Sequence, residues 1–406
     1  MRRDADTMPV SPTVPRFRGW LFALACGLVL VTAVMIFIGG KVTSHEVGMA
    51  VPDGFETFGH WSLVAPLNLW WHDFGTRWEH LHRLQGYVVS FTTLGLLIAL
   101  CFAGVRDKRK GLIVAGVALS AGVILQALLG ILRVDEVSRA LAGVHGVVGQ
   151  LFFAATVLTA VLVGPGWTRR LAAVRRGEAA RRRWPTGALV LLVALVGQLV
   201  LGSAVRHAGA GEAIPDWPLH YGQVVPPMDQ AGVDAAVDEA WAAGDFGGTF
   251  EMTRVTGTGA VETVSSRPAV EAGQVHLHLT HRLGAYAITL FTLVLVGWTL
   301  RRDAGVAAAE PGAATAGVSA GLVVLLALQV ALGVATVLGH VHPTLATLHQ
   351  STGALLLGLA VVFAARSSAA IAARRALPAS ARADAATPSA GGPGWTGAGS
   401  LAGSVN

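Results

Sequence analysis

The chain has 406 residues, of which 53% are hydrophobic and only 13% are charged, and its mean hydropathy is +0.58. This composition excludes an ordinary soluble domain, in which about a quarter of the residues are charged. The net charge of +6 comes from arginines and lysines that gather in particular connections, so nucleic-acid binding explains it poorly and is not expected. We therefore expect an integral membrane protein.

Eight apolar runs are each about 20 residues long, the length needed to cross about 30 Å of hydrocarbon as a helix. Barrel strands are only about ten residues long and alternate in polarity, so these continuous runs exclude a β-barrel. The first run is too long for a cleavable signal peptide and should remain as an anchor. The expected fold is all-α and integral to the membrane, with eight transmembrane helices. The runs begin near Trp20, Tyr87, Gly111, Leu141, Pro185, Leu283, Gly317 and Thr344.

Arginine and lysine residues gather in the two tails and in alternate connections, those after the second, fourth and sixth spans. By the positive-inside rule these segments are cytoplasmic, and so are both termini. We expect a multi-pass protein of the cell (inner) membrane that contacts membrane lipid.

The predicted division of the chain has two four-helix halves, at 19–165 and 185–368, joined by a basic cytoplasmic linker at 166–184. A cytoplasmic N-terminal tail covers 1–18. The C-terminal tail at 369–406 is rich in Ala, Pro, Ser and Gly, and is expected to be disordered.

The second half repeats the motifs of the first in the same order. Ala-Val-Pro-Asp at 50–53 corresponds to Ala-Ile-Pro-Asp at 213–216, an offset of 163. Further along, EHLHRLQGY corresponds to HLTHRLGAY, and LAGVHGVVGQLFF to LATLHQSTGALLL. We therefore expect two pseudo-symmetric four-helix bundles.

One insertion distinguishes the second half. The offset rises to 199 between His82 and His281, so 36 residues have been added. The insert falls within 228–275, on the extracytoplasmic side, and its acidic composition is typical of a solvated elaboration. The sequence does not predict its role.

Four histidines recur at equivalent places, near the extracytoplasmic ends of predicted helices: His82 and His145, then His281 and His349. Facing helices of a four-helix bundle direct side chains into a core that can hold a cofactor. Two imidazoles facing each other there suit the axial positions of a heme iron. An interfacial role is the alternative for any single histidine, but ionisable groups near spans are costly and usually functional. Zinc or di-iron sites fit less well, because paired Glu-x-x-His motifs and cysteine clusters are missing from the sequence.

Small and basic residues near the candidate ligands fit the same interpretation. Arg83 and Arg282 directly follow candidate ligands and could pair with heme propionates, or alternatively extend to the lipid head groups. Glycines recur in the helices without ligands, where they allow a macrocycle or a neighbouring helix to approach closely. These glycines are Gly40, Gly130, Gly202 and Gly333.

The two halves differ at one telling position. Three residues before the candidate ligand, on the same helical face, the first half has Glu79 and the second has His278. A carboxylate beside a heme can accept a proton or stabilise positive charge during oxidation of a substrate. The alternative is a structural carboxylate that pairs with Arg83 or anchors the preceding loop.

Together these motifs resemble the heme A synthases, over roughly residues 20–365. The resemblance rests on Glu-x-x-His-Arg at 79–83, His-x-x-His-Arg at 278–282, the segments GGKVTS, AVPD and VRHAGAGEAIPDWPLHYG, and the histidines of the fourth and eighth helices. It implies a heme-dependent oxidoreductase of heme A biosynthesis and cytochrome oxidase assembly. Such enzymes oxidise the ring D methyl group of heme O to a formyl group and carry heme b as their own cofactor.

The resemblance also implies roles for particular residues. His281 and His349 would be the axial ligands of the resident heme b. His82 and His145 would ligate the substrate, heme O, with Glu79 as the acidic group of the reaction. Heme O synthase and an electron acceptor are the implied partners, and the oligomeric state, including a homo-oligomer, stays open.

One departure from the family pattern concerns thiols. Many members have a cysteine pair in the first extracytoplasmic loop, whereas residues 41–79 contain none. Cys26 and Cys101 both fall inside predicted spans, so a loop disulfide is not expected. The resemblance therefore does not imply a thiol-linked or redox-regulated step for this chain.

Two other functions remain open from the sequence. A bis-histidine b-type cytochrome that only transfers electrons needs the same histidines, but it has no use for a carboxylate at Glu79. A heme transporter needs access to its cargo from both faces of the membrane, whereas the candidate ligands all lie near one face.

Overall fold

The computed structural model describes residues 16–175, 184–246, 251–255, 261–265, 267–303 and 315–376. Eight helices in these ranges are long and apolar enough to span a membrane, which confirms the expected number. The protein therefore has an all-helical, multi-pass membrane fold. The eight are α1 (Gly19–Ser44), α2 (Phe74–Arg106), α3 (Lys110–Asp135), α4 (Arg139–Val163), α6 (Thr186–His207), α8 (Ala272–Asp303), α10 (Ala316–Leu338) and α11 (Pro343–Ala376).

Short elements occupy the connections. Two of them are antiparallel hairpins that the sequence did not predict, β1 (Glu56–Thr57) with β2 (His60–Trp61), and β3 (Glu251–Val255) with β4 (Val261–Ser265). The other short elements are α5 (Pro165–Arg175), α7 (Gln230–Ala243) and the 3₁₀ turns η1 (Ser62–Val64), η2 (Leu67–Leu69) and η3 (Ala210–Glu212).

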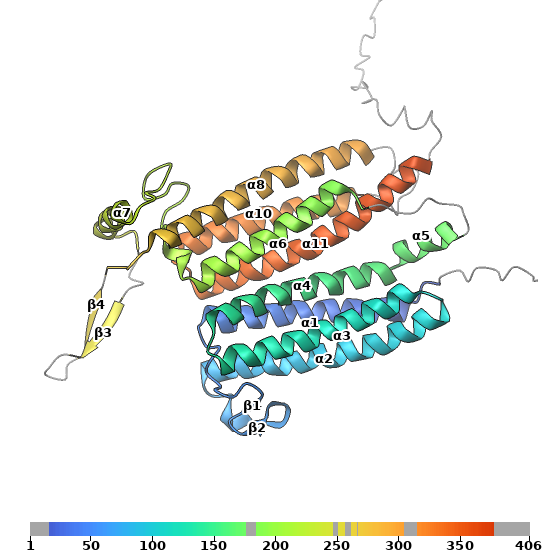
Figure 1. Ribbon diagram of the computed structural model, residues 1–406, viewed down its shortest axis with the longest axis horizontal. Coiled ribbons are helices and arrows are strands. Elements are labelled where there is room, and N and C mark those ends of the chain that lie inside the picture. The colour runs from blue at the N-terminus through green and yellow to red at the C-terminus, as the bar shows by residue number, and fades with distance from the viewer. Residues whose placement is uncertain are drawn as a thin grey trace, which may run out of the picture.

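The long helices lie side by side, α1 to α4 in one group and α6, α8, α10 and α11 in the other (Figure 1). Both hairpins and α7 project from one end of the molecule, at the left in Figure 1, and α5 lies at the opposite end. We call the end that carries the two hairpins and α7 the histidine end, because all four candidate histidines lie near it. Most of the predicted tails, and residues 176–183 of the predicted linker at 166–184, lie outside the described residues. Helix α5 covers the start of that linker, and α11 continues to Ala376, into the predicted C-terminal tail.

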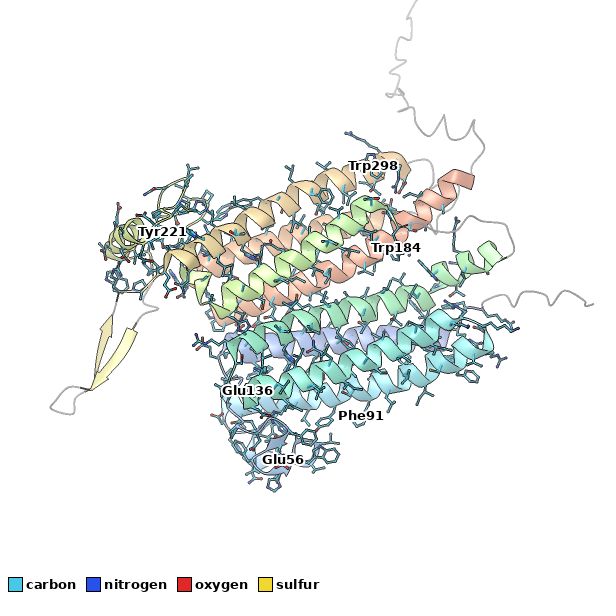
Figure 2. The ribbon with its side chains drawn as sticks, in the orientation of Figure 1. Glu56, Phe91, Glu136, Trp184, Tyr221 and Trp298 are labelled. Atoms are coloured by element: carbon cyan, nitrogen blue, oxygen red, sulfur yellow. The ribbon has the colours of Figure 1, made fainter. Side chains whose placement is uncertain are left out.

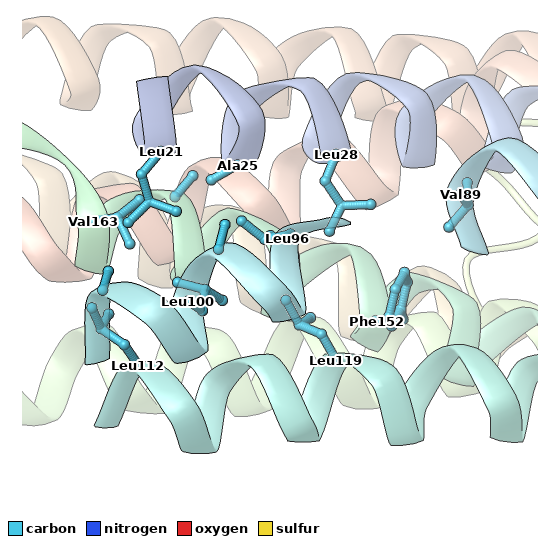
Figure 3. Packing of buried hydrophobic residues seen from close by; sticks show 13 residues of the cluster. Leu21, Ala25, Leu28, Val89, Leu96, Leu100, Leu112, Leu119, Phe152 and Val163 are labelled. Atoms are coloured by element: carbon cyan, nitrogen blue, oxygen red, sulfur yellow. The ribbon is translucent and has the colours of Figure 1, made fainter. Parts of the chain in front are cut away.

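Apolar side chains cover the outward sides of the helices, as a lipid-facing surface requires. Phe91 of α2 and Trp298 of α8 are 60% and 55% exposed (Figure 2). Between the helices, leucines and alanines of α1 to α4 pack into a core that runs along the first group (Figure 3). A second core joins α6, α8, α10 and α11. Phe153 and Val157 of α4 pack against Ala354 and Val361 of α11, and α1 also packs along α11, so these three helices join the two groups.

Helices α2 and α8 begin earlier than the apolar runs predicted, at Phe74 and Ala272 rather than near Tyr87 and Leu283. Their first turns are polar, so a hydropathy pattern alone does not reveal them. Asp73 caps α2 by accepting a hydrogen bond from the Thr76 N–H at 2.7 Å. This hydrogen bond holds the pKa of Asp73 below its ordinary value. The polar first turns of α2 and α8 carry part of the candidate site: Glu79 and His82 in α2, and His278 and His281 in α8.

Candidate functional site

The first pair of candidate ligands, His82 of α2 and His145 of α4, face each other across the first helix group. Their ring centroids are 6.3 Å apart and their planes are inclined by 73°. With a metal–imidazole bond of about 2 Å, as for zinc, and a ring centre about 1 Å behind the bonding nitrogen, rings on opposite sides of one ion lie roughly 6 Å apart. The spacing of the two rings therefore fits a shared metal ion between them, as axial heme ligation requires.

The second pair consists of His281 of α8 and His349 of α11. The two side chains are close enough for their charges to interact. The Nδ1 atom of each has a polar partner on a neighbouring helix. Gln198 of α6 places its amide nitrogen 3.0 Å from Nδ1 of His281, and Nδ1 of His349 lies 3.1 Å from the backbone carbonyl of Gln329 in α10.

The first pair lacks comparable partners. Nδ1 of His82 is buried and makes no hydrogen bond to any described residue. Nδ1 of His145 is also buried, and although the backbone of Gln126 lies near it, no well-formed hydrogen bond joins the two. A histidine that binds a metal usually donates its other ring N–H to a protein group, which fixes the orientation of the ring. Nδ1 of His349 can donate in this way to the Gln329 carbonyl. Gln198 positions His281 differently, because its amide nitrogen is a donor and donates to the His281 backbone carbonyl at 2.8 Å. The second pair therefore has more polar neighbours on other helices than the first.

A glycine on the preceding helix lies against each of the four imidazole rings. A Cβ added to the glycine would come within 2.9 to 3.3 Å of the Cε1 atom of the ring, which is tighter than ordinary contact. From the sequence, Gly40 was expected to let a macrocycle or a neighbouring helix approach closely. It faces Thr347 and Gln350 of the neighbouring α11, and the residue that lies against His82 is Gly39. The pairs are Gly39 with His82, Gly130 with His145, Gly202 with His281, and Gly333 with His349.

Arg83 anchors the loop between α1 and α2. Its Nη2 donates to the carbonyl of Val51 at 3.2 Å, and its Nη1 donates to the carbonyl of Glu56. Arg282 does the same for the loop after α6, donating to the carbonyls of Ile214 at 2.9 Å and Leu219 at 3.2 Å. These carbonyls are related by the offset of 163, so corresponding arginines hold corresponding loops.

Glu79 lies at the centre of the first of these anchors and is only 1% exposed. Its Oε1 accepts from Arg83 Nη2 at 3.0 Å, and its Oε2 accepts from the Val51 N–H at 2.8 Å. The loop therefore closes over the carboxylate. In the second half His278 takes this place, and its Nε2 accepts from Arg282 Nε at 3.2 Å.

Arg133, near the end of α3, was not identified from the sequence. It is close enough for its charge to act on His82, His145 and Glu79. Its Nε is buried and has no hydrogen-bond partner in the part of the chain that the structure describes. Gly48 makes room for the guanidinium, because a Cβ at that position would lie 2.8 Å from Nη1. An arginine at the end of a span, where the second half has Thr336, was the available signal.

Three known proteins with similar sequences are each named heme A synthase. The heme A synthase of Methylobacterium sp. (strain 4-46) is 29% identical over 373 residues, covering 86% of this chain and 91% of that protein. The heme A synthase of Methylobacterium radiotolerans is 28% identical over 292 residues, 71% of this chain and 67% of its own. That of Rhodopseudomonas palustris (strain HaA2) is 25% identical over 384 residues, covering 86% and 90%.

A family model described as cytochrome oxidase assembly protein matches residues 78–361. The match begins at the first polar turn of α2 and ends within α11, so it contains Glu79 and all four candidate histidines. It covers more than half of the chain, and the chain belongs to this COX15-CtaA family of cytochrome oxidase assembly proteins.

Proposed function

We propose that this protein is a heme A synthase, which oxidises a methyl group of heme O to a formyl group. The observation that carries the proposal is the presence of two histidine pairs, of which only the first has a buried carboxylate one helical turn away. The names of the relatives support the same activity. They favour it over a cytochrome that only transfers electrons, for which Glu79 would have no chemical use.

The two helix groups are proposed to be pseudo-symmetric halves with different tasks. His281 and His349 hold a resident heme b, because the Gln329 carbonyl can accept from Nδ1 of His349 and Gln198 holds the His281 turn through its backbone carbonyl. His82 and His145 hold heme O, and a ring without a fixed Nδ1 partner suits a ligand that must be released as product. When bound, the heme groups supply the redox chemistry for oxidising a carbon atom.

Glu79 would act at the edge of the first site. Arg83 and the Val51 N–H hold both carboxylate oxygens in place, so the side chain is oriented before the substrate binds. A fixed carboxylate can take up the proton lost by the substrate methyl carbon, or stabilise positive charge that develops there. His278 cannot replace it, because a buried imidazole next to Arg282 carries no negative charge.

Arginines at the histidine end would bind the carboxylates of the heme groups. Arg83 and Arg282 were proposed for this from the sequence, and each also holds a loop. In the first half, Arg133 supplies a further guanidinium whose Nε has no partner among the described residues. We propose that Arg133 shares the propionates of the substrate with Arg83.

The arrangement in the membrane follows the distribution of basic residues. Both termini and the segment containing α5 would lie in the cytoplasm, and the histidine end would face the other side of the cell membrane. Both heme sites would then lie near the extracytoplasmic surface.

Substitution of Glu79 by Gln tests the proposed function. The variant keeps an oxygen that can accept from Val51 but loses the charge and the basicity, so heme A formation should fall by about 10² to 10⁴. Heme extraction and absorption spectra of membranes that are supplied with heme O would measure this. Glu56→Gln is the matched control, because Glu56 is exposed and only its carbonyl contacts Arg83.

A second variant separates chemistry from loop anchoring. Arg83→Gln breaks the same ion pair but leaves the carboxylate, so it should retain more activity than Glu79→Gln. Because Arg83 is also proposed to bind the substrate propionates, the two variants are compared per bound heme O, and equal losses on that basis would assign Glu79 a structural role. Parental heme A formation by Glu79→Gln would overturn the proposed chemistry.

A further inference from the structure

The loop between α1 and α2, residues 45–73, has a well-packed inner side. Val51, Thr57 and Ser62 are almost fully buried. The hydroxyl of Thr57 lies 3.0 Å from Nδ1 of His80, and Trp70 stacks on the His80 ring with centroids 4.1 Å apart. The loop is therefore a folded unit that rests on the first turns of α2.

The outer side of the same loop is unusually apolar. Seven large apolar side chains of this loop, which we call the apolar apron, are between 38% and 67% exposed. A surface of this kind on an otherwise well-packed loop needs an apolar environment, because contiguous exposed apolar patches mark interaction sites. The apron consists of Phe55, Phe58, Trp61, Leu63, Val64, Leu67 and Trp71.

A line of aromatic rings joins the apron to the lipid-facing side of α2. The ring of Trp61 meets Tyr87 edge to face at 6.1 Å, and Tyr87 stacks on Phe91 at 6.4 Å. From Phe91 the exposed apolar stripe continues along the helix through Leu94, Ile98 and Phe102. The apron is thus continuous with the surface that the spanning helix presents to lipid, and Phe91 and the loop around Glu56 lie on the same outer side of the molecule (Figure 2).

The length of α2 fits a position of the apron at the level of the lipid head groups. Its 33 residues make a helix of about 50 Å, whereas the hydrocarbon layer is about 30 Å thick and the whole bilayer about 40–45 Å. The helix is therefore long enough for its first turns to lie in the head-group layer, and the loop packs beside these turns. Tryptophan and tyrosine are enriched at this level of membrane proteins.

Charged side chains near the apron have the partners expected at such a surface. The guanidinium of Arg77 lies 5.7 Å from the Trp71 ring centre and 5.8 Å from that of Phe74. An arginine that lies over aromatic rings keeps its charge toward water while its neighbours contact lipid. The second half has a related contact, from Trp217 Nε1 to the Tyr286 hydroxyl at 3.2 Å, but there α7 packs over the loop.

We propose that the apolar apron is a membrane-binding surface that lies in the head-group layer of the bilayer at the histidine end. The occupant is lipid, because the apron continues the lipid-facing stripe of α2. The loop that closes over Glu79 would then lie at the bilayer surface, where a lipophilic substrate can reach the first site from the membrane. The proposal concerns the surface alone and does not depend on the proposed enzyme activity.

Fluorescence quenching of single-cysteine variants tests this. Cys26 and Cys101 are first replaced by Ala, and bimane is then attached at Val64→Cys or Leu67→Cys in full-length protein in phosphatidylcholine–phosphatidylglycerol vesicles. Ile98→Cys, on the lipid-facing side of α2, and Glu239→Cys, exposed on α7, provide the two references. Quenching by a lipid with a nitroxide near its head group is compared with quenching by aqueous iodide.

At Val64 and Leu67 we expect quenching by the nitroxide lipid within about twofold of that at Ile98, and little quenching by iodide. Glu239 should give the opposite result. Strong iodide quenching at both apron positions would overturn the proposal by placing the apron in water. Protection from both quenchers would also overturn it, since the apron would then be covered by protein, such as a second copy of the chain.

Discussion

The two helix groups use the same anchor for different purposes. In both, an arginine one residue after a candidate ligand donates to two loop carbonyls, and the pairs of carbonyls are related by the same offset. The group that this arginine orients differs: it is the carboxylate of Glu79 in the first and the imidazole of His278 in the second. The loop anchor is therefore shared, and the two groups differ in the side chain that the arginine contacts.

The two helix groups also carry a glutamine at different positions. In the second, Gln198 of α6 reaches His281, and Gly284 of α8 leaves room for it. In the first, the corresponding residues are Met35 of α1 and Gln85 of α2, and Gln85 donates to the carbonyl of Val31 rather than to a histidine. A fixed imidazole suits a permanent ligand, and a free one suits exchange. This difference supports the proposal that the second pair holds a cofactor and the first pair a substrate.

Replacing single candidate ligands should give the largest difference between the two histidine pairs. His281→Ala and His349→Ala should lose the resident heme b, because each removes one of its two axial bonds. His82→Ala and His145→Ala should keep much of that heme but abolish the formation of heme A. Absorption spectra and extracted heme from the four purified variants measure both effects, and equal loss of heme b from both pairs would contradict the assignment.

Adding a methyl group beside each ring should have a smaller effect. In Gly333→Ala the new Cβ would lie 2.9 Å from Cε1 of His349, so the ring must move, and we expect roughly tenfold weaker retention of heme b. Gly317→Ala in the same helix has open space and is the control. In Gly39→Ala, where the Cβ lies 3.0 Å from His82, heme b should stay and conversion should fall. Gly27→Ala is its control in α1, and unchanged heme content and activity in both tight variants would refute this role of the glycines.

The sequence predicted the parts of the fold that depend on hydrophobicity and spacing. The eight spans follow from apolar runs of sufficient length, and the internal repeat is sufficient to relate His82 to His281. The early starts of α2 and α8 were missed, because their polar first turns are stabilised by loops rather than by lipid. Contacts such as Glu79 with the Val51 N–H depend on how a loop folds back, and no periodic pattern encodes that.

The sequence also did not predict the direction in which individual residues face. Gly39 and Gly40 are adjacent, and only the rotation of α1 against α2 decides which of them meets His82. Arg133 was ambiguous for a similar reason, since an arginine at the end of a span more often extends to the head groups. Its burial beside the first histidine pair became evident only when α3 was packed against α4.

Exchanging the residue that corresponds to Gln198, Met35, should have the smallest effect of these variants. It tests directly why the two histidine pairs differ. Met35 occupies the place that glutamine takes in the other three helices without ligands, and its Cε lies 3.7 Å from the position of a Cβ on Gly86. Met35→Gln should bring an amide near Nδ1 of His82 and so make the first site resemble the second. Side-chain hydrogen bonds in membranes contribute about 0.6 kcal/mol on average, which corresponds to roughly threefold tighter retention of the substrate heme. Release of heme A should slow by a similar factor, as measured by the heme that remains with purified protein after turnover.

Met35→Leu, which is apolar and of similar size, should behave like the parent, and Gln198→Met should loosen the proposed resident heme instead. If Met35→Gln and Met35→Leu retained equal amounts of heme, the missing partner of His82 would not be what distinguishes the two sites.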